Sequence, residues 1–316
     1  MTLSTGGRPM RSLLVDAAGA AASAARRSAV VVRPLETLEQ MLQACELLDR
    51  VWEIPQGQTS EIQPHLLRAL GHGGNYLVAA WEPGGAMVGA SVAFFTEPLG
   101  SAMHSHITGV LPGDSGRGVG AALKWHQRHW AMERGLTKIT WTFDPLIARN
   151  AYFNLTRLGA RPETYFVDFY GAMHDGPNRG QPTDRMQVGW DLSAASTIQA
   201  QTAVLDGSAA DDGPDVSSRM RTGALTLLSA GPAGEPVRGP VVGPEDTLAV
   251  IGIPGDIEQV RRTDPALALS WRFALRSTLA LVMADSSWKV TGFARSGWYL
   301  LQRKAFGDGT DGGARR

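Results

Sequence analysis

The sequence predicts a mixed α/β fold of the α+β kind, with a mostly antiparallel central sheet and a smaller α+β unit near the C-terminus. Three observations lead to this prediction. Apolar runs between residues 75 and 111 are separated by turns too short for a crossover helix, which indicates hairpins. A glycine-rich turn then leads from the last of these runs into a helical pattern. After residue 192 the chain becomes rich in Ala, Gly, Ser and Pro, and regular patterns return at about residue 247.

Composition excludes several classes of protein. The 316 residues are enough for one large domain or two ordinary ones. The 30 Lys and Arg residues are balanced by 30 Asp and Glu residues, so no net charge attracts nucleic acid or an anionic membrane. No run of about 18 apolar residues predicts a membrane span. The single cysteine, Cys45, lies on a helical apolar stripe, which predicts a buried thiol and suits a cytoplasmic location.

The N-terminal part predicts an arm, one strand and two helices. Residues 1–28 are alanine-rich, but Asp16 interrupts their short apolar stretch and two arginines end it, which is not the pattern of a signal peptide. We therefore expect a flexible or helical arm. The β-branched run at 29–34 predicts an opening strand. Apolar residues at helical spacing predict a helix from Leu38 to Trp52, and a shorter helix is expected at 61–70.

The central part predicts most of the sheet. Glu82–Gly85 and Glu97–Gly100 are tight turns between antiparallel strands. The expected elements are, in order, strands at 75–81, 87–97 and 103–111, a helix from 119 to 135, a strand at 136–143, a short helix ended by Gly159, and strands near 163–173 and 186–192. Residues 29–193 therefore form the predicted main domain.

The C-terminal third predicts a second, smaller unit. Residues 194–245 are expected to be a linker or irregular excursion, because segments such as 206–218 are too polar and glycine-rich to bury a core. Residues 246–305 predict a strand, a helix opened by Asp264 and Pro265, and a final hairpin. Residues 306–316 are expected to be a disordered tail. This unit either shapes a substrate pocket beside the main domain or pairs subunits in a homodimer.

The glycine turn runs from Ser115 to Gly120. Three glycines between a strand and a helix let the backbone N–H groups and the positive end of the helix point at one place, which predicts an anion site. With Ala121 the turn also fits the dinucleotide fingerprint G-x-G-x-x-A, and Asp144 follows the next strand, so a dinucleotide-binding protein is one alternative. The preceding hairpins disfavour that alternative. A nucleotide P-loop is excluded because Val119 stands where a lysine is needed.

The order of a strand, an R/Q-x-x-G-x-G/A turn, a helix, a strand and a short helix ending in Leu-Gly resembles the acyl-CoA core of the GNAT superfamily of N-acetyltransferases. The matching pieces are His106 to Leu111, Ser115 to Gly120, Ile139 to Asp144, and Asn150 to Ala160. The motif Trp141-Thr-Phe-Asp-Pro-Leu, with Pro182-Thr-Asp-Arg, resembles more narrowly a group of predicted bacterial GNAT acyltransferases. Some members of that group are associated with amino-acid N-acylation, including N-succinylation.

The resemblance implies an antiparallel sheet that splays at the cofactor and a co-substrate that is acetyl-CoA or another acyl-CoA, without a metal. The pantetheine arm would lie between the strands before and after the turn, and the turn would hold the pyrophosphate. The cofactor-binding residues implied are Thr108, Val110, Leu111, Ser115, Gly116, Arg117, Gly118, Val119, Gly120, Ala121, Asn150 and Asn154. Ser115 stands where the family usually has Gln or Arg.

The chemistry implied is attack of a neutral amine on the thioester, which needs a general base. His104 and His106 lie two apart on one strand and share a face, and Glu97 is the carboxylate candidate. No third ligand at a supporting spacing accompanies the two histidines, so a metal is not expected. Leu155 occupies the position where many family members carry the tyrosine that protonates the leaving thiolate, and Tyr152 is a weak substitute.

The acceptor is expected to be a small-molecule amine. If it is an amino acid, an arginine is the best clamp for its carboxylate, and Arg149 and Arg185 are the candidates. The leading function is therefore N-acyltransfer of an acetyl or succinyl group to a small amine. A non-catalytic acyl-CoA-binding module is the alternative, because the expected tyrosine is missing.

Overall fold

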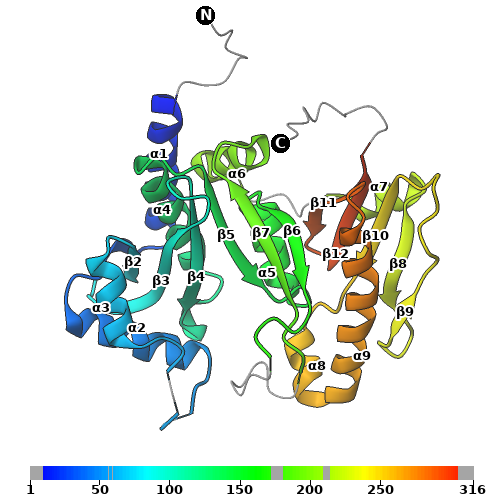
Figure 1. The fold of residues 1–316 in the computed structure, drawn as a ribbon, viewed down its shortest axis with the longest axis horizontal. Coiled ribbons are helices and arrows are strands. Elements are labelled where there is room, and N and C mark those ends of the chain that lie inside the picture. Colours follow the sequence, from blue (N-terminus) through cyan, green and yellow to red (C-terminus); the bar gives the residue numbers. More distant parts are fainter. Residues whose placement is uncertain (1–9, 56, 59, 172–180, 209–213, 305–316) are drawn as a thin grey trace, which may run out of the picture.

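The computed structural model describes residues 10–55, 57–58, 60–171, 181–208 and 214–304. Within them the chain forms a seven-stranded sheet of order β1-β2-β3-β4-β5-β7-β6 and a five-stranded sheet of order β11-β12-β10-β8-β9 (Figure 1). In the first sheet every neighbouring pair is antiparallel except β4 with β5. The predicted mixed α/β fold, with a mostly antiparallel sheet and a smaller second unit, is confirmed.

The strands of the first sheet follow the predicted hairpins. Alternate residues of each central strand point to opposite faces, so Tyr76 and Val78 join one core while Leu77 and Ala79 join another. The bounds are β1 Val31–Pro34, β2 Tyr76–Trp81, β3 Met87–Thr96, β4 Ala102–Val110, β5 Lys138–Phe143, β6 Arg161–Phe166 and β7 Arg185–Asp191.

Helices cover both faces of this sheet. On one face lie α2 (Leu38–Val51) and α3 (Pro64–His72). Helix α2 begins with a capping box, in which the Thr37 side chain accepts from the backbone N–H of Gln40 and the Gln40 side chain caps the backbone of Thr37 in return. Cys45 is buried on this helix, as its place on the apolar stripe predicts. The other face is covered by α4 (Val119–Glu133) and by α1, described next.

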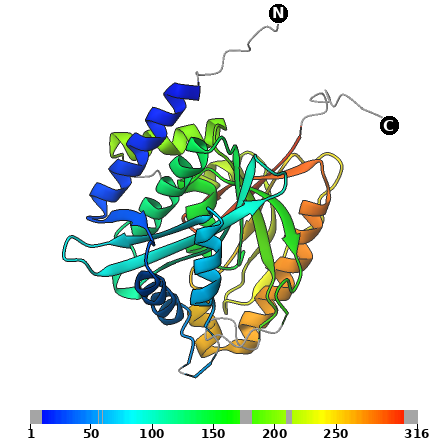
Figure 2. The same ribbon diagram turned by 60° about the vertical axis from the view of Figure 1, so that its left-hand side comes forward.

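The N-terminal segment is not a flexible arm where the structure describes it. Residues Met10–Arg27 form helix α1, which packs along α4 and also contacts α6 (Ala195–Asp206) (Figure 2). Ala17, Ala20 and Ala24 are buried in this contact. Small alanine side chains let two helices approach closely, so of the two expected forms, a flexible or a helical arm, the chain adopts the helical one and packs it. Residues 1–9 lie outside the described residues.

The second unit begins earlier in the chain than expected. Residues 194–245 include α6, α7 (Val216–Arg221), β8 (Leu225–Ala230) and β9 (Pro236–Arg238), so the prediction of a linker is wrong for its described residues. The reason is that β8 pairs in parallel with β10 and buries Leu227 and Leu228, which a local reading of composition does not show. The other elements are β10 Leu248–Gly252, α8 Ile257–Thr263, α9 Pro265–Leu275, β11 Trp288–Ala294 and β12 Trp298–Arg303. The predicted tail at 306–316 lies outside the described residues.

Helix α9 continues through a π-helical turn, η3 (Arg276–Ala280), into α10 (Leu281–Ala284). This run is the one helix among the described residues that is long and apolar enough to cross a membrane by length and composition. Its apolar face, including Trp271 and Leu275, is buried in the main core. One side of the run is therefore packed against the core, while Phe273 and Leu281 on it are exposed.

Candidate functional site

The two parallel strands β4 and β5 part from each other soon after they meet. They pair over three positions only, the last being His104 opposite Thr140. Beyond that point β4 continues to Val110 and β5 to Phe143 without pairing with each other, and the strands diverge (Figure 1). We call this opening, from Ser105 on β4 and Trp141 on β5 onward, the fork. It leaves one backbone edge of β4 without a strand partner.

A β-bulge on β4 lies at the fork. Ala93 of β3 faces Ser105 and Val92 faces Ile107, so His106 is the extra residue. Further along, Leu111 N–H donates to Val88 O at 3.0 Å. Because antiparallel partners alternate between bonded and unbonded pairs, the backbone groups of Thr108 and Val110 then point away from β3 and into the fork. The prediction for these two residues fits this geometry, whereas Leu111, predicted beside them, directs its N–H to β3 instead.

The glycine turn follows β4 through a short 3₁₀ turn, η1 (Pro112–Asp114), and its last two residues are the first two of α4. Gly116 and Gly118 have φ of 83° and 90°, a region that favours glycine. Gly118 is the N-cap of α4 and has no side chain to satisfy the first N–H groups of the helix. Five backbone N–H groups donate to no acceptor among the described residues, those of Gly116, Gly118, Val119, Gly120 and Ala121. They form the predicted anion site.

Arg117 is held at the rim of this turn. Its guanidinium pairs with Asp114 and, at 2.7 Å, with Glu82 of the β2–β3 turn. The side chain is therefore committed to two carboxylates on the surface. Ser115, where the resemblance would place Gln or Arg, is exposed and makes the turn through its backbone N–H, which donates to Pro112 O at 3.2 Å.

The two candidate histidines share a face of the sheet, as predicted. Both rings contact Phe94, and their centroids are 6.5 Å apart. His104 Nδ1 lies 3.2 Å from Thr140 Oγ1 across the last β4–β5 pair. Burial, with the nearby charges of His106 and Lys124, lowers the pKa of His104 to about 4. Partial burial also lowers the pKa of His106, whose side chain lies nearer the surface.

Glu97 is not brought to the fork. It is exposed in the turn after β3, beyond the closed end of the fork where Ala102 pairs with Lys138. The earlier prediction that it serves as the carboxylate base is therefore wrong for this geometry, because the fork opens in the opposite direction along β4. A carboxylate in that turn is solvated and lies away from both histidines.

The short helix after β5 carries the remaining candidates. It consists of α5 (Ala148–Tyr152) followed by a π-helical turn, η2 (Phe153–Arg157). Asn150 and Tyr152 are half-buried, and Asn154 is buried. Leu155, at the position expected for a tyrosine, is 2% exposed and packs in the core. An alkyl group there provides no proton donor.

Sequence reasoning missed Lys124, which is buried at the fork. Its Nζ donates to Ser105 Oγ at 2.7 Å and to Gln127 Oε1 at 3.2 Å, and lies 3.9 Å from the centre of the Trp141 ring. No carboxylate of the described residues is within ion-pair distance of it. Burial lowers the pKa of this amine to about 7. The sequence Leu-Lys-Trp-His-Gln-Arg, residues 123–128, predicts a buried lysine only if α4 is known to be covered on both sides.

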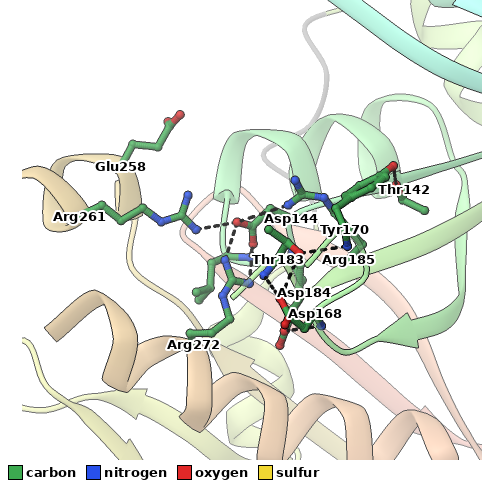
Figure 3. A network of polar contacts seen from close by, with 12 residues as sticks. Thr142, Asp144, Asp168, Tyr170, Thr183, Asp184, Arg185, Glu258, Arg261 and Arg272 are labelled. Atoms are coloured by element: carbon green, nitrogen blue, oxygen red, sulfur yellow. Dashed lines mark hydrogen bonds and ion pairs between the residues drawn. The ribbon is translucent and has the colours of Figure 1, made fainter. Parts of the chain in front are cut away.

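Asp144, at the end of β5, is the centre of an arginine cluster (Figure 3). Arg272 of α9 donates to both of its oxygens at 2.8 and 2.6 Å, and Arg261 of α8 donates at 2.6 Å. Arg185 lies 3.9 Å away. Burial alone would raise the pKa of Asp144, but the charge and hydrogen bonds of Arg272, and then Arg261 and Arg185, outweigh it and keep the pKa well below its usual range. This carboxylate is committed to arginines and is not free for a ribose.

A second carboxylate, Asp184, repeats this arrangement one strand away. Arg276, one turn after Arg272, donates to Asp184 through Nε at 2.9 Å and through its terminal nitrogen at 2.6 Å. Tyr165 donates to the same carboxylate at 2.7 Å. The two motif aspartates therefore attach the α9 run to the ends of β5 and β7. We call Asp144 and Asp184, together with the helix arginines Arg261, Arg272 and Arg276, the docking cluster.

The two arginines expected to clamp a substrate differ in their surroundings. Arg149 pairs through both terminal nitrogens with Glu258 of α8, one of these bonds being 2.8 Å, so its prediction as a substrate clamp is not supported. Arg185 is buried between Asp144 and the ring of Tyr170, whose centroid is 5.3 Å away. Tyr170 contacts Thr142 on the face of β5 that also carries Thr140 and, next to it, His104. Arg185 therefore shares a face with the histidines.

The dinucleotide alternative does not fit the structure. A Rossmann site needs a doubly wound parallel sheet, and in the seven-stranded sheet that carries the glycine turn only β4 and β5 are parallel. Among the described residues, no three His, Cys, Asp or Glu side chains gather as a metal site. A cavity of about 340 Å³ lies elsewhere, between α6, η2 and β11, and none of its lining residues belongs to the fork or the turn.

No protein-family model and no curated protein matches the sequence. Solved structures similar to the chain include the ribosomal-protein-S18-alanine N-acetyltransferase from Escherichia coli, at 15% identity and a TM-score of 0.42, covering 52% of this chain and 96% of that one. An N-acetyltransferase from Staphylococcus aureus has 12% identity and a TM-score of 0.44, covering 52% and 98%. A GNAT family acetyltransferase from Elizabethkingia anophelis with acetyl-CoA bound has 13% identity and a TM-score of 0.39, and the match covers 52% of this chain and 98% of that one. About half of this chain is thus similar to acetyltransferase structures.

Proposed function

We propose that the chain is an acyl-CoA-dependent N-acyltransferase of the GNAT type, which transfers an acetyl or succinyl group to a small-molecule amine such as an amino acid. The single observation that carries the proposal is the fork. A β4 edge with free backbone groups leads directly to five N–H groups at the positive end of α4. A long ligand with an anionic end and an amide-bearing arm fits this arrangement.

In this proposal the backbone of the turn binds the pyrophosphate, and Thr108 and Val110 bond to the pantetheine arm. The N–H of the bulge residue His106 would polarise the thioester carbonyl. The amine would approach from the face that carries both histidines. His106 is the better base of the two, because a pKa of about 4 gives His104 little tendency to take a proton at neutral pH. Arg185 would contact a carboxylate on the acceptor.

The test is turnover with acetyl-CoA and succinyl-CoA across a panel of small amines and amino acids, measured by release of free thiol. We expect thiol release that depends on the amine, and a melting temperature raised by CoA but not by NAD. Thiol release that is equally fast without any amine would indicate a hydrolase and contradict the proposal. A protein stabilised by NAD and not by CoA would contradict the assignment of the fork.

A non-catalytic acyl-CoA-binding module is the second candidate, and one observation favours it. Leu155 is a buried alkyl group where the resemblance places a proton donor. This candidate predicts a CoA-dependent rise in melting temperature without thiol release for any amine in the panel. The two candidates therefore separate in a single pair of measurements on the full chain.

A further inference from the structure

The buried Lys124 occupies the point at which β4 and β5 part. The last pair between these strands is His104 with Thr140, so the first residues beyond it are Ser105 and Trp141. Nζ of Lys124 contacts both, at 2.7 Å from the Ser105 hydroxyl and 3.9 Å from the Trp141 ring centre. The amine thus bridges the two sides of the fork from the α4 face, opposite the face of the histidines.

We propose that Lys124 is the proton donor to the departing CoA thiolate, an inference that rests on the proposed function. Lys124 follows Val119 by five residues, which places its Cα about 7.5 Å deeper along α4 than the anion site. A ligand whose pyrophosphate lies on the turn and whose arm runs into the fork brings its thioester toward Nζ. Among the described side chains at the fork, Lys124 is the ionisable group that touches the innermost residue of both edges.

The surroundings suit a group that gives up a proton rather than one that holds a fixed charge. Neutral acceptors and an aromatic face surround the amine, and burial lowers its pKa to about 7. Because an ordinary thiol has a pKa of about 8.5, transfer from such an ammonium to a thiolate is downhill.

Few other ionisable groups face this amine. The titratable groups on the elements packed against α4 include Asp16 on α1, Tyr76 on β2, and His104 and His106 on β4. Of these, His104 interacts with Lys124 through charge, and a proton on either one disfavours a proton on the other. Asp16 acts on Arg128 instead. On α4 itself, His126 bonds to Tyr76 and Arg128 to the Leu192 carbonyl.

The step balances without an additional reactant. The neutral amine nitrogen forms a bond to the thioester carbon, and its surplus proton passes to a histidine and then to solvent. The carbon–sulfur bond breaks with its electron pair going to sulfur. The sulfur takes a proton from the Lys124 ammonium, giving free CoA thiol and a neutral lysine. Lys124 regains its proton from water before the next turnover.

The experiment compares the full-length wild type with Lys124→Met and Lys124→Arg. Met has a similar length but no proton, whereas Arg keeps the positive charge but does not release a proton near neutral pH. We expect both variants to lose kcat on the order of 100-fold, the lower end of general acid catalysis, with little change in the Kd for CoA. We also expect the wild-type kcat to fall as the pH rises above about 7, and this decline to be absent in Lys124→Met.

Three results would overturn the inference while leaving the proposed function intact. The first is an active wild type with equally active Lys124→Met. The second is near-normal kcat in Lys124→Arg, which would mean that charge rather than proton transfer matters. The third is an acyl group found on Lys124 by mass spectrometry and discharged to the amine, which would make it a nucleophile. An inactive wild type that binds CoA would instead overturn the proposed function and this inference together. Melting temperatures of both variants confirm that they fold.

Discussion

The fork and the docking cluster both place charge in the interior, but they compensate it in opposite ways. At the docking cluster Asp144 and Asp184 are each bonded by an arginine through two nitrogens. At the fork Lys124 is bonded only to neutral groups, and the N–H groups of the glycine turn have no acceptor among the described residues. In the docking cluster, the charged groups are paired with one another. At the fork, the N–H groups can still bind a ligand and the lysine can still exchange a proton.

Whether a buried charged group has a counter-ion therefore distinguishes structural residues from binding residues better than membership of a sequence motif does. The motif Trp141-Thr-Phe-Asp-Pro-Leu supplies one residue to each region, because Trp141 contacts Lys124 and Asp144 binds Arg272. Buried ion pairs hold elements in one arrangement, and breaking one leaves a charge without compensation. A buried amine without a counter-ion responds to pH and to ligands. The following predictions test whether the two regions really differ in this way.

The largest effect is expected for Asp144→Ala. It leaves the buried Arg272 and Arg261 without their shared carboxylate, and such losses cost about 3–5 kcal/mol. Denaturant unfolding measures the change. The matched control is Glu133→Ala, which removes an exposed carboxylate 3.7 Å from His129 and should cost less than about 1 kcal/mol. Equal costs for the two variants would mean that the docking cluster is not structural.

The next effect is the pH dependence of the stability of wild type relative to Lys124→Met. Burial lowers the pKa of this lysine to about 7 from its ordinary 10.5, so between these values the unfolded chain binds more protons than the folded one. The loss of folding stability caused by burying the charged lysine is complete below pH 7 and disappears as the pH rises toward 10.5. The wild type should therefore gain stability relative to the variant from pH 7 to 10, by at most about 1.4 kcal/mol per pH unit. A flat difference in denaturant unfolding would show that Lys124 is solvated.

A smaller effect is expected for Gly118→Ala. A Cβ at this position would lie 2.8 Å from Ser28 Oγ, and φ of 90° strains any residue but glycine, so we expect a loss of more than about 1 kcal/mol. The rise in melting temperature with CoA should also shrink. Gly113→Ala is the control, because it has open space and no positive φ. Loss of the CoA response in the control as well would assign the effect to the loop in general.

The smallest effect is expected for Arg149→Ala. Its side chain is 65% exposed although it pairs with Glu258, so removal should cost less than about 1 kcal/mol. We also expect an unchanged KM for amino-acid acceptors, in contrast to Arg185→Ala, which should raise that KM. A raised KM in the Arg149 variant would restore its predicted role as a substrate clamp.

The parts of the fold that depend on local pattern could be predicted from the sequence. The hairpins before the turn, the turn itself and the strand after it are predicted by short-range alternation of apolar and polar residues and by the positions of glycines. Two features depend on contacts between distant segments and were not predicted in full. The alanine-rich residues were expected to be a flexible or helical arm, and they form a helix that packs on α4 and covers it on a second side. Arg128 is buried on that side, where it bonds to Leu192 and Gln201. Lys124 is buried on the sheet side against Ser105 and Trp141, although local spacing alone would place both side chains on the surface.

The site could be predicted only where it is made of backbone. Thr108, Val110 and the glycines were found because a turn and a strand edge are local features. The partners of Asp144 could not be found, since Arg272 lies 128 residues later in the chain. One signal was available. Two arginines four residues apart on an apolar helix, Arg272 and Arg276, indicate two buried acceptors one turn apart.

That spacing has a consequence for how the molecule unfolds. Arg272 and Arg276 join the α9 run of the small unit to the ends of β5 and β7 in the large sheet, and Tyr299 adds a hydrogen bond of 2.6 Å to Pro145 O. The two units cannot separate without breaking these buried ion pairs and exposing the apolar core that both units share. The chain should therefore melt in one cooperative transition, and a fragment ending near residue 193 would not be an independent folding unit.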